Sequence, residues 1–181
     1  MCDSTNAERP GFTMTERKVG KTFESIFSDH THQRIIVATF ASNVDRVQQI
    51  INTAYKFGRK VVVEGRSMVN IISIASELGY LNIPDNTLIE VDQLKNYPDE
   101  KTVLITTGSQ GEPLAALSRM ANGIHRKVKI QPNDLIVFSS NRFREMRKRF
   151  PRSLTICTVR AQRLFFRIPT YPDMPARKRS N

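Results

Sequence analysis

Short, strongly apolar runs alternate with amphipathic stretches through the middle of the chain. Three runs are rich in valine, isoleucine and threonine, which is typical of buried parallel strands. These runs lie at residues 34–40, 60–64 and 102–107. After each run the apolar positions recur at helical spacing, and the stretches end at Gly58, Gly79 and Gly123, as helices commonly do. This repeated strand–loop–helix unit predicts an α/β fold with a mainly parallel sheet flanked by helices.

Three weaker segments also have strand character. They lie at residues 88–91, 128–130 and 135–138. The first follows a Pro-Asp-Asn turn and is short, so we expect an edge strand there, and the other two flank a Pro-Asn-Asp turn. The opening 29 residues are polar, and we expect Phe12 and Phe23 to attach them to the rest of the chain.

Small polar residues follow each of the three main strands, at 41–43, 65–67 and 108–111. Ligands of parallel sheets bind at the carboxyl ends of the strands, so we expect these segments to share one edge. Each leads into a helix N-terminus, whose backbone N–H groups favour an anion, and Arg66 adds a cation. The segments indicate either a phosphate-binding edge or ordinary turns that use glycine and serine for their geometry.

The net charge of +11 is concentrated near the carboxyl end of the chain. Residues 142–181 hold 12 Lys and Arg, 2 Asp and Glu and no glycine, so they account for +10 of the total. The first 141 residues are close to neutral, which is typical of a globular domain. Basic segments attract nucleic acid, and here that property belongs to 142–181.

Cysteine and histidine are scarce in this sequence. Cys2 and Cys157 are too few for a disulfide scaffold, and we find neither a membrane-length apolar run nor a secretory signal. We therefore expect a cytoplasmic protein without membrane contact. His-Thr-His at 30–32 lacks the Asp-His that would complete a metal motif, and His125 is the third histidine. We therefore predict no metal site and no Ser-His-Asp triad in this chain.

A series of short segments in a fixed order resembles ribonuclease J, and within it the β-CASP domain, the RNA-specificity insertion of a metallo-β-lactamase-fold nuclease. The segments are Asp-Ser-Thr-Asn at 3–6, Phe-Thr-Met at 12–14, Ala-Thr-Phe-Ala-Ser-Asn at 38–43 with Gln-Gln at 48–49, Gly-Arg-Ser-Met at 65–68, Thr-Gly-Ser-Gln-Gly-Glu-Pro at 107–113, Ala-Leu-Ser-Arg at 116–119 and Phe-Ser-Ser at 138–140. The resemblance covers residues 2–141.

The resemblance implies a cytoplasmic hydrolase of RNA processing and decay. Members of this family use two zinc ions to activate a water, act as endonucleases and as 5′-to-3′ exonucleases that prefer a 5′-monophosphate, and form homo- or hetero-oligomers. RNA passes between the β-CASP domain and the metal domain. The family pattern implies that Ser42 and Asn43 help to hold the terminal phosphate, and that Asp3 lies near the metal centre as the candidate catalytic residue.

The resemblance and the sheet-edge argument together nominate one set of RNA or phosphate-binding residues. This set is Ser42, Asn43, Arg66, Ser67, Gly108, Ser109 and Gln110. Two parts of the family pattern are missing. The His-x-His-x-Asp-His motif is absent with the half that would precede Met1, and so are the downstream half and the dimerising domain. We therefore expect this chain to bind no zinc and to be inactive alone.

The segment after Asn141 departs from the family, which continues Pro-Ile-Pro-Gly-Asn-Glu where this chain has Arg-Phe-Arg-Glu-Met-Arg at 142–147. Allowed codons for these residues spell the family motif after a shift of one base. The same shift permits the family's Ser-Gly-His motif near residues 170–179. We therefore predict a partial β-CASP domain at 1–141 and a disordered, frameshifted basic tail at 142–181. A natural RNA-binding tail is the alternative.

Two functions remain open from the sequence. The first is a fragment of a zinc-dependent ribonuclease that contributes binding of the RNA 5′-phosphate. The alternative is a non-enzymatic RNA-binding or regulatory module that acts through the strand-end loops and the basic tail. Assembly with a separate chain that supplies the metal domain is a third arrangement.

Overall fold

The sheet of this protein is parallel throughout. The structure is a computed structural model, and it describes residues 16–109, 115–139 and 165–167. The strands are β1 (Ile35–Ala38), β2 (Lys60–Glu64), β3 (Thr102–Thr106), β4 (Leu135–Phe138) and β5 (Phe165–Arg167). They are arranged in the order β2-β3-β1-β4-β5, with every neighbouring pair parallel. The predicted α/β class with a parallel sheet is confirmed.

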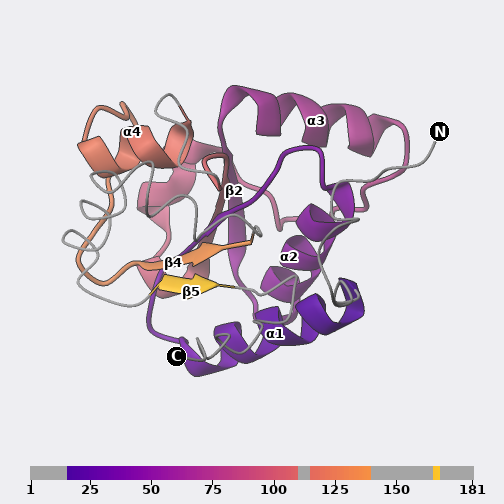
Figure 1. Cartoon of the computed structure of the whole chain (residues 1–181), viewed down its shortest axis with the longest axis horizontal. Coiled ribbons are helices and arrows are strands. Elements are labelled where there is room, and N and C mark those ends of the chain that lie inside the picture. The colour runs from indigo at the N-terminus through magenta and orange to yellow at the C-terminus, as the bar shows by residue number, and fades with distance from the viewer. Residues whose placement is uncertain (1–15, 110–114, 140–164, 168–181) are drawn as a thin grey trace, which may run out of the picture.

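Helices cover both faces of the sheet. They are α1 (Glu16–Asp29), α2 (Val44–Lys56), α3 (Arg66–Glu77) and α4 (Ala116–Asn122), with the 3₁₀ turns η1 (Val91–Asn96) and η2 (Asp99–Lys101) before β3. Figure 1 shows α1, α2 and α3 on one side of the sheet and α4 on the other. None of the described helices is both long enough and apolar enough to span a lipid bilayer.

The central strand β1 explains the continuous apolar run in the sequence. Ile35 and Val37 face the helices α1–α3, whereas Ile36 and Ala38 face α4. Successive side chains of a strand point to opposite faces, so a strand covered on both sides needs an apolar residue at every position. All four residues of β1 are fully buried.

The predicted helix ends are confirmed. Gly58 and Gly79 follow the C-caps of α2 and α3, and Gly123 is itself the C-cap of α4. The φ angle of Gly123 is +74°, a left-handed conformation that costs glycine little and other residues more. Helix length in this fold is therefore set by local chain geometry.

Helix α1 differs from the sequence prediction, because the overall polarity of the opening residues indicates no element there. In the structure Val19, Phe23 and Phe27 lie on one face of this helix and are buried against α2 and the sheet. Their spacing of four residues is the signal that the overall polarity of the segment concealed. The attachment through Phe23 is confirmed, and Phe12 lies outside the described residues.

Two predicted strands are wrong. At 88–91 the only pairing is a single bridge between Leu88 and Val61. The chain then turns into η1, where the Gln93 side chain accepts a hydrogen bond from the Glu90 N–H. At 128–130 there is no strand, because β4 already has β1 on one side and β5 on the other. This segment instead packs Val128 against the α4 side of the sheet.

Strand β5 lies within the segment that the sequence analysis assigned to a tail. Its three residues pair with β4 in parallel register, from Phe165 opposite Ile136 to Arg167 opposite Phe138. The remaining positions of 142–181 lie outside the described residues. The boundary at residue 141 therefore stays a prediction.

Candidate functional site at the carboxyl edge of the sheet

The register of the parallel strands places their carboxyl ends side by side. Ala38 pairs with Thr106 on one side and with Phe138 on the other, and Glu64 pairs with Thr106. The segments after β2, β3 and β1 therefore follow one another along a single edge, as predicted. Residues 110 and 111 of the third segment, and with them Gln110, lie outside the described residues, as does Asp3.

Asn43 begins helix α2 as its N-cap. Its side-chain Oδ1 accepts a hydrogen bond from the Arg46 backbone N–H at 3.0 Å, the usual role of asparagine at this position. The oxygen is therefore occupied by the helix, and the amide nitrogen is the group that Asn43 offers to a ligand. Ser42 precedes it in the turn and is exposed, so its hydroxyl faces solvent at the start of the helix.

Arg46 is a buried cation at this edge that the sequence analysis did not single out. Its side chain is 2% exposed, and its guanidinium Nη1 donates a hydrogen bond to the Ser139 hydroxyl. Because Ser139 directly follows β4, this bond joins the first turn of α2 to the end of a neighbouring strand. The sequence does contain a signal for this burial. Arg46 precedes Ile50 by four residues, and this helical spacing places both on the buried face of α2.

Gly65 closes the turn between β2 and α3 in a conformation that needs glycine. Its φ angle is +108°, and a Cβ atom there would lie 2.8 Å from the Thr107 Oγ1 atom. Helix α3 begins at the next residue, so Arg66 and Ser67 form its first turn. Both side chains are exposed, and no side chain caps the helix. Two exposed polar side chains therefore lie at the N-terminus of α3, whose first N–H groups have no side-chain cap.

Gly108 and Ser109 differ from the other candidates because they are buried. A Cβ atom on Gly108 would lie 3.0 Å from the Leu117 Cβ and 3.1 Å from the Ala115 Cβ. The preceding residue, Thr107, accepts a backbone hydrogen bond from Leu117 at 3.2 Å. These contacts attach the end of β3 to α4. The buried Gly108 and Ser109 are therefore part of the support of the carboxyl edge. Their contact with phosphate stays a prediction.

A carboxylate and an imidazole flank the β2 end of this edge. Glu64 Oε2 lies 3.3 Å from His125 Nε2, without hydrogen-bond geometry. The other ring nitrogen, Nδ1, accepts the Val128 backbone N–H at 3.1 Å, so the ring proton belongs on Nε2. His125 thus holds the loop after α4 beside β2. Within the described ranges, no three His, Cys, Asp or Glu side chains are grouped so as to hold a metal ion.

The comparisons with known proteins agree with this architecture. The β-CASP domain model of ribonuclease J matches residues 32–145. Ribonuclease J of Mycolicibacterium smegmatis is 50% identical over 141 residues, which is 78% of this chain and 25% of that protein. The Synechocystis ribonuclease J is 48% identical over 141 residues, 78% of this chain and 22% of that protein. Ribonuclease J2 of Bacillus subtilis is 43% identical over 141 residues, 77% of this chain and 25% of that protein.

This chain spans about a quarter of the length of the curated relatives that it matches. The family model, by contrast, covers most of this chain and includes β1 to β4 with the loops of the carboxyl edge. The chain belongs to the ribonuclease J β-CASP domain family.

Proposed function

We propose that this chain contributes the RNA-contacting part of a ribonuclease J and that its carboxyl edge holds the 5′-monophosphate of the RNA. One observation carries the proposal. The parallel register brings the start of α2, with Ser42 and Asn43, and the start of α3, with Arg66 and Ser67, to the same edge of the sheet.

The chemistry of this edge suits a phosphate group. Two helix N-termini supply backbone N–H groups and the positive end of each helix dipole. The exposed Arg66 adds a charge-assisted donor, and the Ser42 and Ser67 hydroxyls add neutral donors. Arg46 and Asn43 hold the start of α2 in place, so the donors of that helix are positioned before a ligand arrives.

The two zinc ions of the family have no ligand set among the described residues. The sequence also lacks the His-x-His-x-Asp-His motif of the family, and on that basis we propose that this chain is inactive alone. Catalysis would require the metal-binding part of a ribonuclease J, either in a longer chain or in a partner. The proposed contribution of this chain is to bind and orient the RNA.

The test compares two RNAs that differ only at the 5′ end. We expect the full chain to bind a short single-stranded RNA with a 5′-monophosphate about tenfold more tightly than the same RNA with a 5′-hydroxyl, which corresponds to about 1.4 kcal/mol. Fluorescence anisotropy with a 3′ label measures both affinities. Ser42→Ala and Arg66→Ala should each reduce the ratio, because each removes a donor to the phosphate.

Matched controls separate this effect from general loss of charge or of a hydroxyl. Arg17→Ala on α1 and Ser76→Ala on α3 change exposed residues away from the edge, and they should leave the ratio unchanged. Equal affinity of the wild-type chain for the two RNAs would contradict the proposal that the carboxyl edge holds the 5′-monophosphate.

Tail-driven binding is the second candidate function, and the 12 Lys and Arg of residues 142–181 favour it. In that case both RNAs bind equally, the affinity falls steeply with salt, and deletion of 142–181 abolishes binding.

A further inference from the structure

A pocket of about 910 Å³ lies on the α4 side of the sheet. Its lining comes from η1 and the turn after it, from the loop between α4 and β4, and from Arg34, which precedes β1. None of the described candidate phosphate-binding residues lines the pocket, and Arg34 and Ser42 lie beyond opposite ends of β1. On the β2 side the pocket reaches toward the carboxyl edge, because His125 holds the loop after α4 beside Glu64. We call it the basic pocket.

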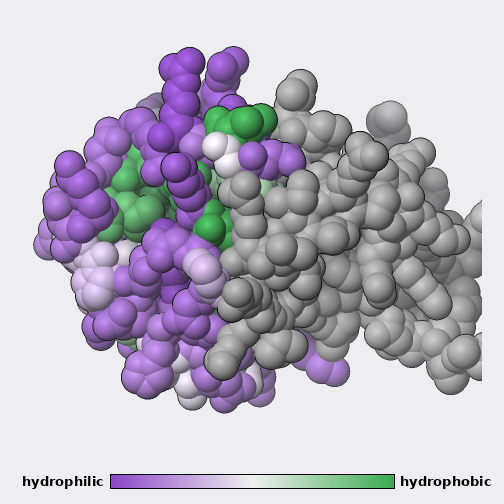
Figure 2. All heavy atoms as spheres, turned by 90° about the vertical axis from the view of Figure 1, so that its left-hand side faces the viewer, coloured by the Kyte–Doolittle hydropathy of each residue, from purple (hydrophilic) through white to green (hydrophobic). Residues whose placement is uncertain are grey.

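The floor of the basic pocket is apolar. Val128 is fully buried, and Val91 and Leu94 pack against the same hydrophobic cluster on the α4 side of the sheet. Figure 2 views the molecule from that side and shows hydrophobic residues at the bottom of a hollow edged by hydrophilic ones. The partly buried Val91 and Leu94 can therefore contact the uncharged part of a ligand while the rim contacts its charges.

Positive charge dominates the rim, where five cationic side chains face two acidic ones. Lys127 is paired with Asp92 at 2.9 Å, and this hydrogen bond raises the pKa of Lys127 above its ordinary value. Three further exposed cations, Lys95, Arg126 and Lys129, have no acidic partner within the described part of the chain. The pocket therefore favours an anionic ligand.

The loop that carries Arg126, Lys127 and Lys129 is held at one end by Arg34. The guanidinium donates to Asp134 at 2.8 and 2.5 Å and to the Lys129 carbonyl at 2.8 Å. Asp134 in turn accepts the Gln131 N–H at 2.7 Å. Burial raises the pKa of the Asp134 carboxyl, and the hydrogen bond and charge of Arg34 oppose that shift. The remaining guanidinium nitrogen, Nη1, lies 3.8 Å from Asp99 Oδ1, so the buried Arg34 is engaged with protein groups on every side and fixes the loop.

The other end of the loop is held by His125, whose Nδ1 accepts the Val128 N–H at 3.1 Å and faces the Lys127 N–H at 3.4 Å. The backbone that carries Arg126, Lys127 and Lys129 is thus fixed between two buried polar groups. A ligand at this rim does not have to order the loop, which reduces the entropic cost of binding.

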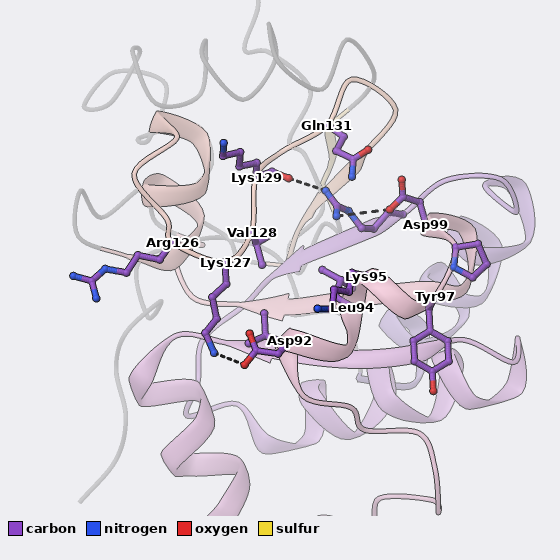
Figure 3. Close-up of a pocket in the computed structure, with 13 residues that line it drawn as sticks. Asp92, Leu94, Lys95, Tyr97, Asp99, Arg126, Lys127, Val128, Lys129 and Gln131 are labelled. Carbon is purple, nitrogen blue, oxygen red and sulfur yellow. Dashed lines mark hydrogen bonds and ion pairs between the residues drawn. The ribbon is translucent and has the colours of Figure 1, made fainter.

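We propose that the basic pocket is a second RNA-binding site, which takes internal phosphodiester groups of single-stranded RNA. The arrangement of the cations favours a chain of phosphates over one terminal phosphate. In Figure 3 Arg126, Lys127 and Lys129 leave the loop in three different directions, whereas a single phosphate needs donors that converge. The apolar floor then accommodates a base, as in sequence-tolerant binding of single strands. The identity of the ligand as RNA rests on the proposed function.

The experiment uses the full chain and a labelled single-stranded RNA of about 12 nucleotides with a 5′-hydroxyl end, so that the proposed 5′-phosphate contact contributes nothing. We expect the double variant Lys95→Ala/Lys129→Ala to weaken binding about tenfold. We also expect a shallower plot of log affinity against log salt, by about 0.7 for each phosphate that the variant no longer neutralises. Both lysines are exposed, so circular dichroism should show an unchanged fold.

The control is Lys18→Ala/Lys21→Ala, which removes two exposed lysines from α1 on the other side of the sheet. It makes the same change in net charge and should leave both affinity and slope near the wild-type values. If the two double variants weaken binding equally, the effect comes from net charge and the basic pocket is not a site.

Two further outcomes separate an RNA site at the basic pocket from the 5′-phosphate site and from a site for acidic protein. If the wild-type chain binds the 5′-monophosphate and 5′-hydroxyl RNAs equally while Lys95→Ala/Lys129→Ala still weakens binding, the 5′-phosphate site fails and the basic pocket stands. If a poly-glutamate peptide of equal charge displaces the RNA as well as unlabelled RNA does, the pocket recognises acidic protein segments and the RNA proposal is overturned.

Discussion

At the scale of the residue, contacts between single atoms determine the shape of the carboxyl edge. Gly65 has room for a hydrogen but not for a methyl group, because the Thr107 side chain occupies that position. Asn43 and Arg46 act in a similar way through single polar contacts, one to a backbone N–H and the other to the Ser139 hydroxyl. Gly65, Asn43 and Arg46 therefore shape the edge through contacts with other parts of the protein.

Gly65→Ala tests this close approach. We expect the free energy of unfolding to fall by about 2–3 kcal/mol, since the substitution combines a positive φ with a steric clash. Gly79→Ala is the matched control, because Gly79 also has a positive φ but no atom within 4 Å of the added Cβ, and it should cost about 1 kcal/mol. Urea denaturation measures both values. Equal losses in the two variants would mean that the Thr107 contact has no energetic effect.

At the scale of the element, helix α1 shows how a polar segment becomes part of the core. Its apolar residues pack on α2 and the sheet. Arg59, just before β2, donates to the Gln33 carbonyl at 2.7 Å and to the His30 carbonyl at 2.6 Å, and burial lowers the pKa of this arginine. These bonds hold the chain between α1 and β1 against the start of β2.

Phe23→Ala tests the contribution of α1. Phe23 is fully buried, and truncation of such a side chain costs about 3–5 kcal/mol, because its packing is removed and a cavity remains. Lys21→Ala in the same helix changes an exposed residue and should alter stability by less than about 0.5 kcal/mol. Chemical denaturation followed by circular dichroism compares them. A small effect of Phe23→Ala would show that α1 is not docked in solution.

At the scale of the whole molecule, the position of a strand in the sheet determines how many neighbouring strands it pairs with. β1 lies between β3 and β4, whereas the three-residue β5 lies at the edge with one neighbour. The carboxyl edge and the basic pocket, which are the two candidate RNA contacts, are both built on this sheet, so a single rigid sheet would connect them. The connection requires that the sheet from β2 to β4 fold as one unit.

Hydrogen exchange tests that requirement. We expect the amides of β1 to exchange slowest, at a rate set by global unfolding, because they pair on both sides. The amides of β5 should exchange much faster, since this short strand can detach without unfolding the sheet. Mass spectrometry of peptic fragments measures both. If β5 is protected as strongly as β1, residues beyond 141 belong to the cooperative domain and the predicted boundary is wrong.

Local patterns in the sequence determined most of the parallel sheet and its carboxyl edge. The apolar runs of β1 to β3 and the glycines after α2 and α3 are short-range signals, because strand and helix periodicity act over neighbouring residues. The rule that parallel strands align their ends then placed the loops after β1 and β2 together. Family motifs pointed to the ribonuclease J β-CASP domain, and the family match confirms that domain. The same motifs pointed to the loop residues, whose contact with phosphate stays a prediction.

Only the tertiary structure decided the features that depend on distant partners. Residues 128–130 are as apolar as a strand, yet they form none because both edges of β4 are occupied. The burial of Arg46 depends on Ser139, which is distant in sequence. The basic pocket likewise combines η1 with a loop some 30 residues later. Long-range packing selects among local preferences, and the hydrophobic periodicity of a single sequence does not show which distant segments contact each other.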